Sequence, residues 1–336
     1  MSSSVTPSLS NTFELSGLNQ FARSNGDDVQ VYVEPTREQL FWVRVLGSLV
    51  SPPDNRGSWL ARTFRLVGVT PIAHLAWSSL LFQAYLYELF HLTLLARVGH
   101  FVLMPLIVGA LMLAAAPLHL VGVHPAEHTT TLFAANGALV VAGVLAAWYL
   151  WLAIREKMLA WGLVMVLVLA ALYVGVNAFY YQNFILDPTQ RGWLSALPTP
   201  LNPWVWLPIL GILTSLSHML EPNLPPRVTG TNRWMPVREF FVGPPTRPLP
   251  LTTTLINLIR GGAQSLFGAL DELWATPRLF PIGILRQMWR FGYQHHRQAE
   301  LNALVKRALD EGNPALDFIG SGGGAFLQLP QERPGR

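Results

Sequence analysis

Histidine side chains are the groups through which this sequence could do chemistry. His91 and His100 lie at the start of an apolar stretch, and His218 lies at the end of a later one, with Glu221 three residues further on. Imidazole and carboxylate groups bind transition metals, and an ionisable residue at the edge of a membrane span indicates a functional site. The pattern predicts one metal site made of His91, His100 and His218, with Glu221 as the accompanying carboxylate.

Helical geometry decides whether these side chains could reach one ion. His218 and Glu221 are about 300° apart on a helix, so they share a face. His91 and His100 are about 900° apart, which places them on opposite faces of a straight helix. They meet only if the chain bends between them, and Arg97–Gly99 is the expected corner. In a straight helix they would instead be interfacial residues beside lipid headgroups.

A rival cluster lies in the segment PLHLVGVHPAEH. His124 and His128 have the spacing of a metal-binding pair on a helix, with His119 nearby. Pro125 restricts His124 to extended backbone, which moves it out of helical geometry. The alternative is an ordinary helix start, with His124 before the helix, Pro125 in its first turn and Glu127 favourable at its amino end.

The sequence lacks the other common motifs of catalytic sites. The chain has no Cys, which excludes disulfides, thiolate metal sites, iron–sulfur clusters and Cys nucleophiles. It also lacks a P-loop, a GxSxG motif and an HExxH motif. His295 and His296 lie in a basic amphipathic stretch and are expected on the surface.

The composition indicates the environment in which a site would form. Of 336 residues, 12% are charged and 51% are hydrophobic, whereas globular domains carry about 25% charged residues. These values argue against a soluble enzyme, a disordered chain and a coiled coil, and they favour a membrane protein with lipid as its partner. The net charge is +4, but the basic residues are scattered, which argues against nucleic acid.

Four uncharged stretches are predicted to cross the bilayer as helices. They are Val98–Leu118, Leu132–Ile154, Met158–Tyr181 and Asn202–Met219. Residues 66–97 are also apolar, and we expect an interfacial or re-entrant helix there. A fifth span with an external amino terminus is the alternative. The predicted fold is therefore all-α, a polytopic membrane helical bundle of about four spans.

Three regions result from this pattern. Residues 1–65 are a polar and basic amino-terminal segment that we expect to be loosely packed, residues 66–221 are the membrane helical domain, and residues 222–336 are a Pro-rich loop and a helical tail. The tail is expected to form helices over Leu251–Trp274, Pro281–Phe291 and Gln298–Asp310 that lie on the cytoplasmic membrane surface. Such a tail would be separable from the spans.

The basic residues predict the orientation. They gather before residue 98, at Arg155 and Lys157, and after residue 221, while the 119–131 and 182–201 connections hold only Arg191. Because cytoplasmic loops carry an excess of Lys and Arg, both termini are expected to be cytoplasmic. The protein would reside in a bacterial inner membrane or in the endoplasmic reticulum.

The first histidine motif resembles that of a known family. Tyr87-x3-His91-x8-His100-x4-Pro105 is similar to the amino-terminal motif of the family of the yeast 2-hydroxy fatty acid dioxygenase, a small multi-span membrane domain. Ala96 stands where that family has Asn between the two histidines. The resemblance covers about residues 80–230 and leaves the remaining regions without a counterpart.

A second motif supports the same family. Ser217-His218-x2-Glu221-x3-Pro225 looks like the family's Gly-His followed by Glu and then Pro-Ala. Ser217 replaces the Gly, and His218 and Glu221 are three residues apart where the family usually has four.

The resemblance implies an iron(II)-dependent dioxygenase that uses O₂ to shorten 2-hydroxy fatty acids by one carbon. A site at the membrane surface would let the acyl chain lie in the bilayer while the carboxylate reaches the metal. Arginine suits that carboxylate, because a guanidinium matches it with two hydrogen bonds. The implied groups are the Fe(II) ligands His91, His100 and His218, the catalytic carboxylate Glu221, and the substrate-binding candidates Arg97, Arg227 and Arg233.

Two other classes of protein remain open. A non-catalytic membrane scaffold or small-molecule carrier would have interfacial histidines and would bind no metal. A proton-coupled transporter needs ionisable residues in the middle of its spans, and the spans hold almost none.

Overall fold

The computed structural model describes residues 20–25, 28–33, 77–91, 94–118, 120, 133–185, 202–219 and 250–311. Near the amino end, β1 (Gln20–Asn25) and β2 (Asp28–Val33) form an antiparallel hairpin. Valine occupies every second position of β2, which is typical of a strand. This hairpin departs from the loosely packed segment that the polar composition suggested, and the remaining regular elements are helices.

Four apolar helices follow the predicted spans. They are α4 (Leu94–Ala115), α5 (Gly137–Arg155), α6 (Leu159–Tyr180) and α7 (Pro203–Met219), with a π-helical extension of α6, η4, over Tyr181–Ile185. By length and composition α4, α5 and extended α6 could each cross a membrane. α7 has 17 residues, of which Pro203–Thr214 form a shorter apolar helix among the residues whose side chains are described. The predicted helical architecture is thus confirmed, and three of its helices are long and apolar enough to cross a membrane.

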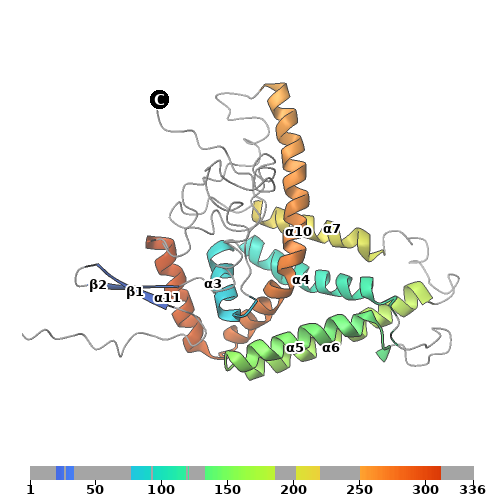
Figure 1. The fold of residues 1–336 in the computed structure, drawn as a ribbon, viewed down its shortest axis with the longest axis horizontal. Helices are drawn as coiled ribbons and strands as arrows, with labels where there is room; N and C mark the ends of the chain where they lie inside the picture. The colour runs from blue at the N-terminus through green and yellow to red at the C-terminus, as the bar shows by residue number, and fades with distance from the viewer. Residues whose placement is uncertain are drawn as a thin grey trace, which may run out of the picture.

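These helices lie side by side, and α5 and α6 form a tight hairpin (Figure 1). At their connection a Cβ added to Gly162 would lie 2.4 Å from the Cβ of Ala153, so any larger residue would force the helices apart. At the opposite end Asn136 donates a hydrogen bond of 2.8 Å to Oδ1 of buried Asn177. This pair satisfies polar groups that would be costly to bury alone.

Apolar side chains also cover the outside of the helices. Exposed large residues include Leu94, Val98, Val102 and Leu106 on α4, Val144, Trp151 and Ile154 on α5, Leu163 and Leu167 on α6, and Trp204, Trp206 and Leu213 on α7. Soluble monomers rarely expose apolar surface of this extent. The outer faces therefore fit helices in contact with lipid.

A short helix, α3 (Leu80–Phe90), precedes α4 and is buried from Leu80 to Glu88. Its amino end is capped twice: Ser79 accepts from the backbone N–H of Phe82, and the Glu156 carboxylate accepts from those of Leu80 and Leu81 at 2.7 and 3.1 Å. Its 11 residues rise about 16 Å, well short of a core of roughly 30 Å. α3 alone is therefore too short to be the alternative fifth span, and residues 66–76 lie outside the described residues.

The chain bends where α3 meets α4. His91 ends α3 with φ −120° and ψ 73°, and α4 begins at Leu94. A bend between His91 and His100 is therefore present, as a shared site requires. The predicted corner at Arg97–Gly99 is wrong, because those residues lie inside α4.

The carboxyl-terminal region contains α10 (Leu251–Arg290) and α11 (His295–Glu311). α10 is one helix of 40 residues where two were expected, and it passes through Pro277 and Pro281. Pro281 has no N–H for the carbonyl of Pro277, and the Tyr149 hydroxyl donates to that carbonyl at 2.6 Å instead. The structure thus replaces a missing helical bond with a bond to α5.

α10 also packs against the membrane-type helices. It crosses α7 and α4 and then turns alongside α3 (Figure 1). Its buried residues Phe280, Ile282, Leu285 and Trp289 belong to the same core as Met104, Trp161 and Met165. The described contacts therefore join α10 to the bundle, whereas the sequence suggested a separable tail.

Candidate metal site

The bend between α3 and α4 brings His91 and His100 together. Their Nε2 atoms are 3.2 Å apart, and the rings meet nearly edge to face. Both side chains are buried, with 4% and 2% of their surface exposed. This burial differs from that of interfacial histidines beside headgroups. Sequence reasoning named both residues, and the structure places them in one spot.

Backbone carbonyls fix the orientation of both rings. Nδ1 of His91 lies 2.8 Å from the carbonyl oxygen of Tyr87, and Nδ1 of His100 lies 2.8 Å from that of Ala96. A carbonyl only accepts hydrogen bonds, so each Nδ1 carries a hydrogen and donates it. Nε2 is then the ring nitrogen of each histidine that could bind a metal. Metal-bound histidines are held in the same way, with the second ring nitrogen donating to a carbonyl.

The distance between the two Nε2 atoms suits a shared ion. Two nitrogens bound at right angles to one ion, each at about 2.1 Å, are about 3 Å apart. The observed 3.2 Å is close to that separation. The two residues therefore fit two neighbouring ligands of one metal ion.

A carboxylate from α10 lies beside this pair. Oε2 of Glu272 is 3.5 Å from Nε2 of His100, and Glu272 is buried with 4% of its surface exposed. Sequence reasoning treated Glu272 only as part of an amphipathic helix. The available signal was an acidic residue in line with the buried positions Ala269, Thr276 and Phe280, three or four residues apart on one helix face.

Tyr87 packs against both histidines. Its ring stacks on His91 at a centroid distance of 4.0 Å and meets His100 edge-on at 6.1 Å. Burial raises the pKa of Tyr87 to about 12, so the phenol keeps its proton. The stacked ring helps hold His91 in place.

Two arginines surround Glu88 at the edge of the site. Arg97 contacts Oε2 of Glu88 at 2.9 Å and donates to the carbonyl of His91 at 2.6 Å. Arg286 contacts the other carboxylate oxygen at 3.1 Å. Arg97, predicted to bind substrate, thus lies near the histidines, and its guanidinium is paired with Glu88.

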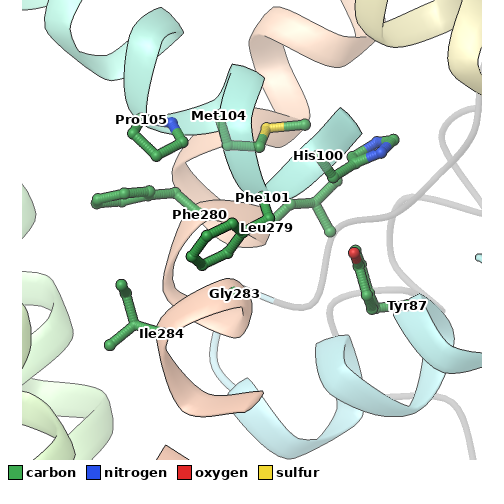
Figure 2. Close-up of a pocket in the computed structure, with 9 residues that line it drawn as sticks. All are labelled: Tyr87, His100, Phe101, Met104, Pro105, Leu279, Phe280, Gly283 and Ile284. Atoms are coloured by element: carbon green, nitrogen blue, oxygen red, sulfur yellow. The ribbon is translucent and has the colours of Figure 1, made fainter. Parts of the chain in front are cut away.

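An apolar pocket adjoins the histidines. Figure 2 shows side chains of α3, α4 and α10 around it, with Tyr87 and His100 as its polar lining groups. The other lining residues are Phe101, Met104, Pro105, Leu279, Phe280, Gly283 and Ile284. The pocket therefore combines an apolar wall with one of the predicted metal ligands.

The other predicted site residues lie partly or wholly outside the described residues. His218 lies in the last turn of α7, which packs against α4 and α10, but its side chain is outside the described set. Glu221, Arg227 and Arg233 lie outside the described residues, as does the rival pair His124 and His128.

In the part of the chain that the structure describes, no three His, Asp or Glu side chains are arranged closely enough to hold one ion. His295 and His296 are exposed, as predicted. The described site is therefore a histidine pair with a neighbouring carboxylate.

Comparison with protein families, with curated proteins and with solved structures found no match to this chain. The functional interpretation therefore depends on the geometry of the site and on the motif resemblance.

Proposed function

We propose that this protein is a membrane-embedded iron(II)-dependent oxygenase that acts on fatty acyl substrates of the 2-hydroxy acid type. The observation that carries the proposal is the buried pair of Nε2 atoms, 3.2 Å apart, with both Nδ1 atoms engaged by carbonyls. Imidazole suits Fe(II). His91 and His100 would hold the ion, with His218 as the third histidine that the motif resemblance implies.

The surroundings suit an amphipathic substrate. Fe(II) would supply the activation of O₂, and the protein would position the substrate and exclude water. The pocket beside His100 offers apolar side chains to an acyl chain. Arg97, 33% exposed and close to the histidines, is the described arginine that could exchange Glu88 for a substrate carboxylate.

The proposal includes an arrangement in the membrane. α7 would be the fourth span, with α3 and α10 near the cytoplasmic surface and both termini in the cytoplasm. The α5–α6 connection, the bend between α3 and α4 and the second half of α10 lie toward the same end of the bundle (Figure 1). A bacterial inner membrane or the endoplasmic reticulum fits this orientation.

The test is the metal content and oxygen uptake of detergent-purified protein reconstituted with Fe(II) without air. We expect about one iron per chain and O₂ consumption with a 2-hydroxy fatty acid. His91→Ala and His100→Ala should each lower iron affinity by more than the roughly 100-fold typical of groups that only orient a ligand, and should abolish oxygen uptake.

His295→Ala is the matched control, because that histidine is exposed on α11. It should leave both iron content and oxygen uptake unchanged. Retention of iron by His91→Ala and His100→Ala, with loss of iron in His124→Ala or His128→Ala, would place the site in the rival cluster. A stable, metal-free wild-type protein would favour the scaffold or carrier.

A further inference from the structure

We propose that Arg286 on α10 acts with Arg97 to bind the carboxylate head of an acyl substrate, whose chain then lies in the apolar pocket beside His100. This inference rests on the proposed function for the class of substrate, and it names the groups that recognise that substrate. Arg286 is not among the arginines predicted from the sequence to bind substrate, and α10 lies outside the motif resemblance.

A carboxylate already lies between the two arginines. Oε2 of Glu88 is 2.9 Å from Nη2 of Arg97, and Oε1 of Glu88 is 3.1 Å from Nε of Arg286. The arginine side chains are 33% and 18% exposed, so neither is sealed inside the protein. A guanidinium carries five N–H donors whose fork matches the geometry of a carboxylate. The position of Glu88 therefore shows that the space between the arginines fits a carboxylate.

The charges of these three side chains favour one more anion. Two guanidinium groups and one carboxylate sum to one positive charge. The ring of Tyr87 lies beside Arg286, with 5.3 Å between the guanidinium carbon and the ring centroid. This contact attracts the cation but adds no negative charge. A positive charge in partly apolar surroundings is costly unless an anion balances it, and the single charge of a carboxylate is enough.

The pocket begins one helical turn from each arginine. Phe101 follows Arg97 by four residues on α4, and Gly283 precedes Arg286 by three residues on α10, so each pair shares one face of its helix. Every lining residue of α4 follows Arg97, and every lining residue of α10 precedes Arg286 (Figure 2). The two arginines thus lie at one end of a largely apolar pocket, as a charged head and an acyl chain require.

Entry of a chain requires one lining side chain to move. The open space in the pocket is about 10 Å³, which is roughly the room that one water molecule needs. Phe101 is the side chain placed to move, because it is 43% exposed on the outer apolar surface of α4 beside Val98 and Val102. A Cβ added to Gly283 would lie 3.3 Å from Cδ2 of Phe101. A turn of this ring toward the lipid would open the pocket to the bilayer.

The experiment measures the binding of 2-hydroxypalmitic acid to metal-free, full-length protein in nanodiscs of neutral phosphatidylcholine. The acid displaces a fluorescent fatty acid, cis-parinaric acid, and displacement is followed by energy transfer from tryptophan. Arg286→Gln should weaken binding of the acid by at least about tenfold, because hydrogen bonds between charged groups are lost. The uncharged methyl ester of the acid should bind equally to Arg286→Gln and to the wild type.

Arg290→Gln is the matched control. Arg290 is exposed, one turn after Arg286 on the same helix, and its substitution should leave the affinity for the acid unchanged. Arg286→Lys guards against a folding defect in Arg286→Gln, because it keeps the charge and loses only the fork of donors. It should bind the acid with an intermediate affinity.

Glu88→Gln separates a binding site from a structural ion pair. If Glu88 occupies the place that the substrate carboxylate takes, removal of its charge should raise the affinity for the acid. An ion pair that only holds α3, α4 and α10 together predicts a lower Tm and weaker binding in both Glu88→Gln and Arg286→Gln. That result, or wild-type affinity in Arg286→Gln, would overturn the inference.

A phospholipid phosphate is the other anion that two arginines would bind in a membrane. Phosphatidylglycerol added to the nanodiscs should not compete with the acid. Competition that requires Arg286 would assign the arginines to a phospholipid and overturn the inference.

Because the binding experiment contains no iron, its outcome is separate from that of the proposed function. Binding of the acid that requires Arg286, without O₂ consumption by the Fe(II) form, keeps the head-group site and loses the oxygenase. O₂ consumption that Arg286→Gln leaves unchanged in both kcat and KM keeps the oxygenase and loses the head-group site.

Discussion

Among single residues, Glu156 joins three parts of the molecule. It follows the last residue of α5, and its carboxylate accepts the first two N–H groups of α3. Arg297 of α11 donates to its backbone carbonyl at 2.6 Å. This one residue therefore links the α5–α6 connection, α3 and α11, and through α3 it supports the position of His91.

The protonation of Glu156 should make stability depend on pH. Burial raises the pKa of this carboxyl from 4.5 to about 7. The folded protein then binds the proton more tightly than the unfolded chain, so the stabilising contribution is complete below about pH 4.5 and is lost as the pH rises through about 7. At about 1.4 kcal/mol per pKa unit, a shift from 4.5 to about 7 corresponds to a loss of at most about 3.5 kcal/mol.

Thermal unfolding of metal-free protein in detergent, followed from pH 4.5 to 8, measures this effect. The wild-type Tm should fall over that range, and Glu156→Gln, which cannot titrate, should show a smaller fall. Parallel curves for the two proteins would contradict the assignment.

The histidine pair shows how far residue types can predict a site. His91 and His100 could be named because a buried imidazole at a span edge is unusual and because their spacing matches a motif. The requirement for a bend also followed from helical geometry. Glu272 could not be found this way, because its approach depends on how α10 crosses α4, and a distant helix leaves no spacing signal near His100.

Among the elements, the crossing of α7 and α10 decides where Glu272 lies. A Cβ added to Gly211 would be 2.8 Å from the carbonyl oxygen of Ala269 and 3.1 Å from its Cα. The backbones of the two helices therefore touch one turn before Glu272. Small residues permit such close approach between membrane helices.

A larger residue at this crossing should therefore disturb the metal site. Gly211→Val should push α10 away from α7, lower Tm by several degrees and reduce iron affinity at least tenfold. Gly175→Val on α6 is the control, since a Cβ there meets nothing within 4 Å. Equal effects of the two substitutions would mean that the Gly211 contact does not position the site.

Removing α10 tests whether the bundle and its metal site require this helix. A chain ending at residue 249 lacks Glu272 and the buried residues Phe280, Leu285 and Trp289. Burial of each large apolar side chain contributes about 1.5–3 kcal/mol, so we expect this truncation to aggregate or to lose its metal. A chain ending at residue 311 should remain monodisperse in size-exclusion chromatography and bind metal normally.

The sequence instead predicted that the tail could be separated from the spans. The separate helices at Leu251–Trp274 and Pro281–Phe291 were predicted because Pro277 and Pro281 usually end a helix. In the structure the helix continues, the Tyr149 hydroxyl donates to the Pro277 carbonyl that Pro281 leaves without a helical donor, and Trp161 donates to the carbonyl of Pro281. These partners come from α5 and α6, so the continuity of α10 depends on tertiary contacts that local patterns do not contain.

On the scale of the whole molecule, arginine side chains of α4, α5 and α10 gather around α3, where Arg97 and Arg286 contact Glu88 and Arg155 donates to the carbonyl of Ser78. The bend between α3 and α4, the α5–α6 connection and the second half of α10 lie toward one end, and the carboxyl ends of α4 and α6 lie toward the other (Figure 1). Arg97, Arg155 and Arg286 belong to the first end. The length and apolarity of α4, α5 and α6 were predictable from the sequence, because a bilayer demands both.

This placement of the arginines predicts a definite topology. Lys and Arg are retained on the cytoplasmic side, so the end that carries the histidine pair should face the cytoplasm. A topology reporter fused after residue 230 should report a cytoplasmic position. The same reporter inserted near His124 should report an external position. With α4, α5, α6 and α7 all crossing, the two positions must lie on opposite sides.

If α7 does not cross, the chain after it stays external, and the reporter at residue 230 then reads external together with the one near His124. That outcome would leave three spans and would separate His218 from His91 and His100 by the full thickness of the membrane.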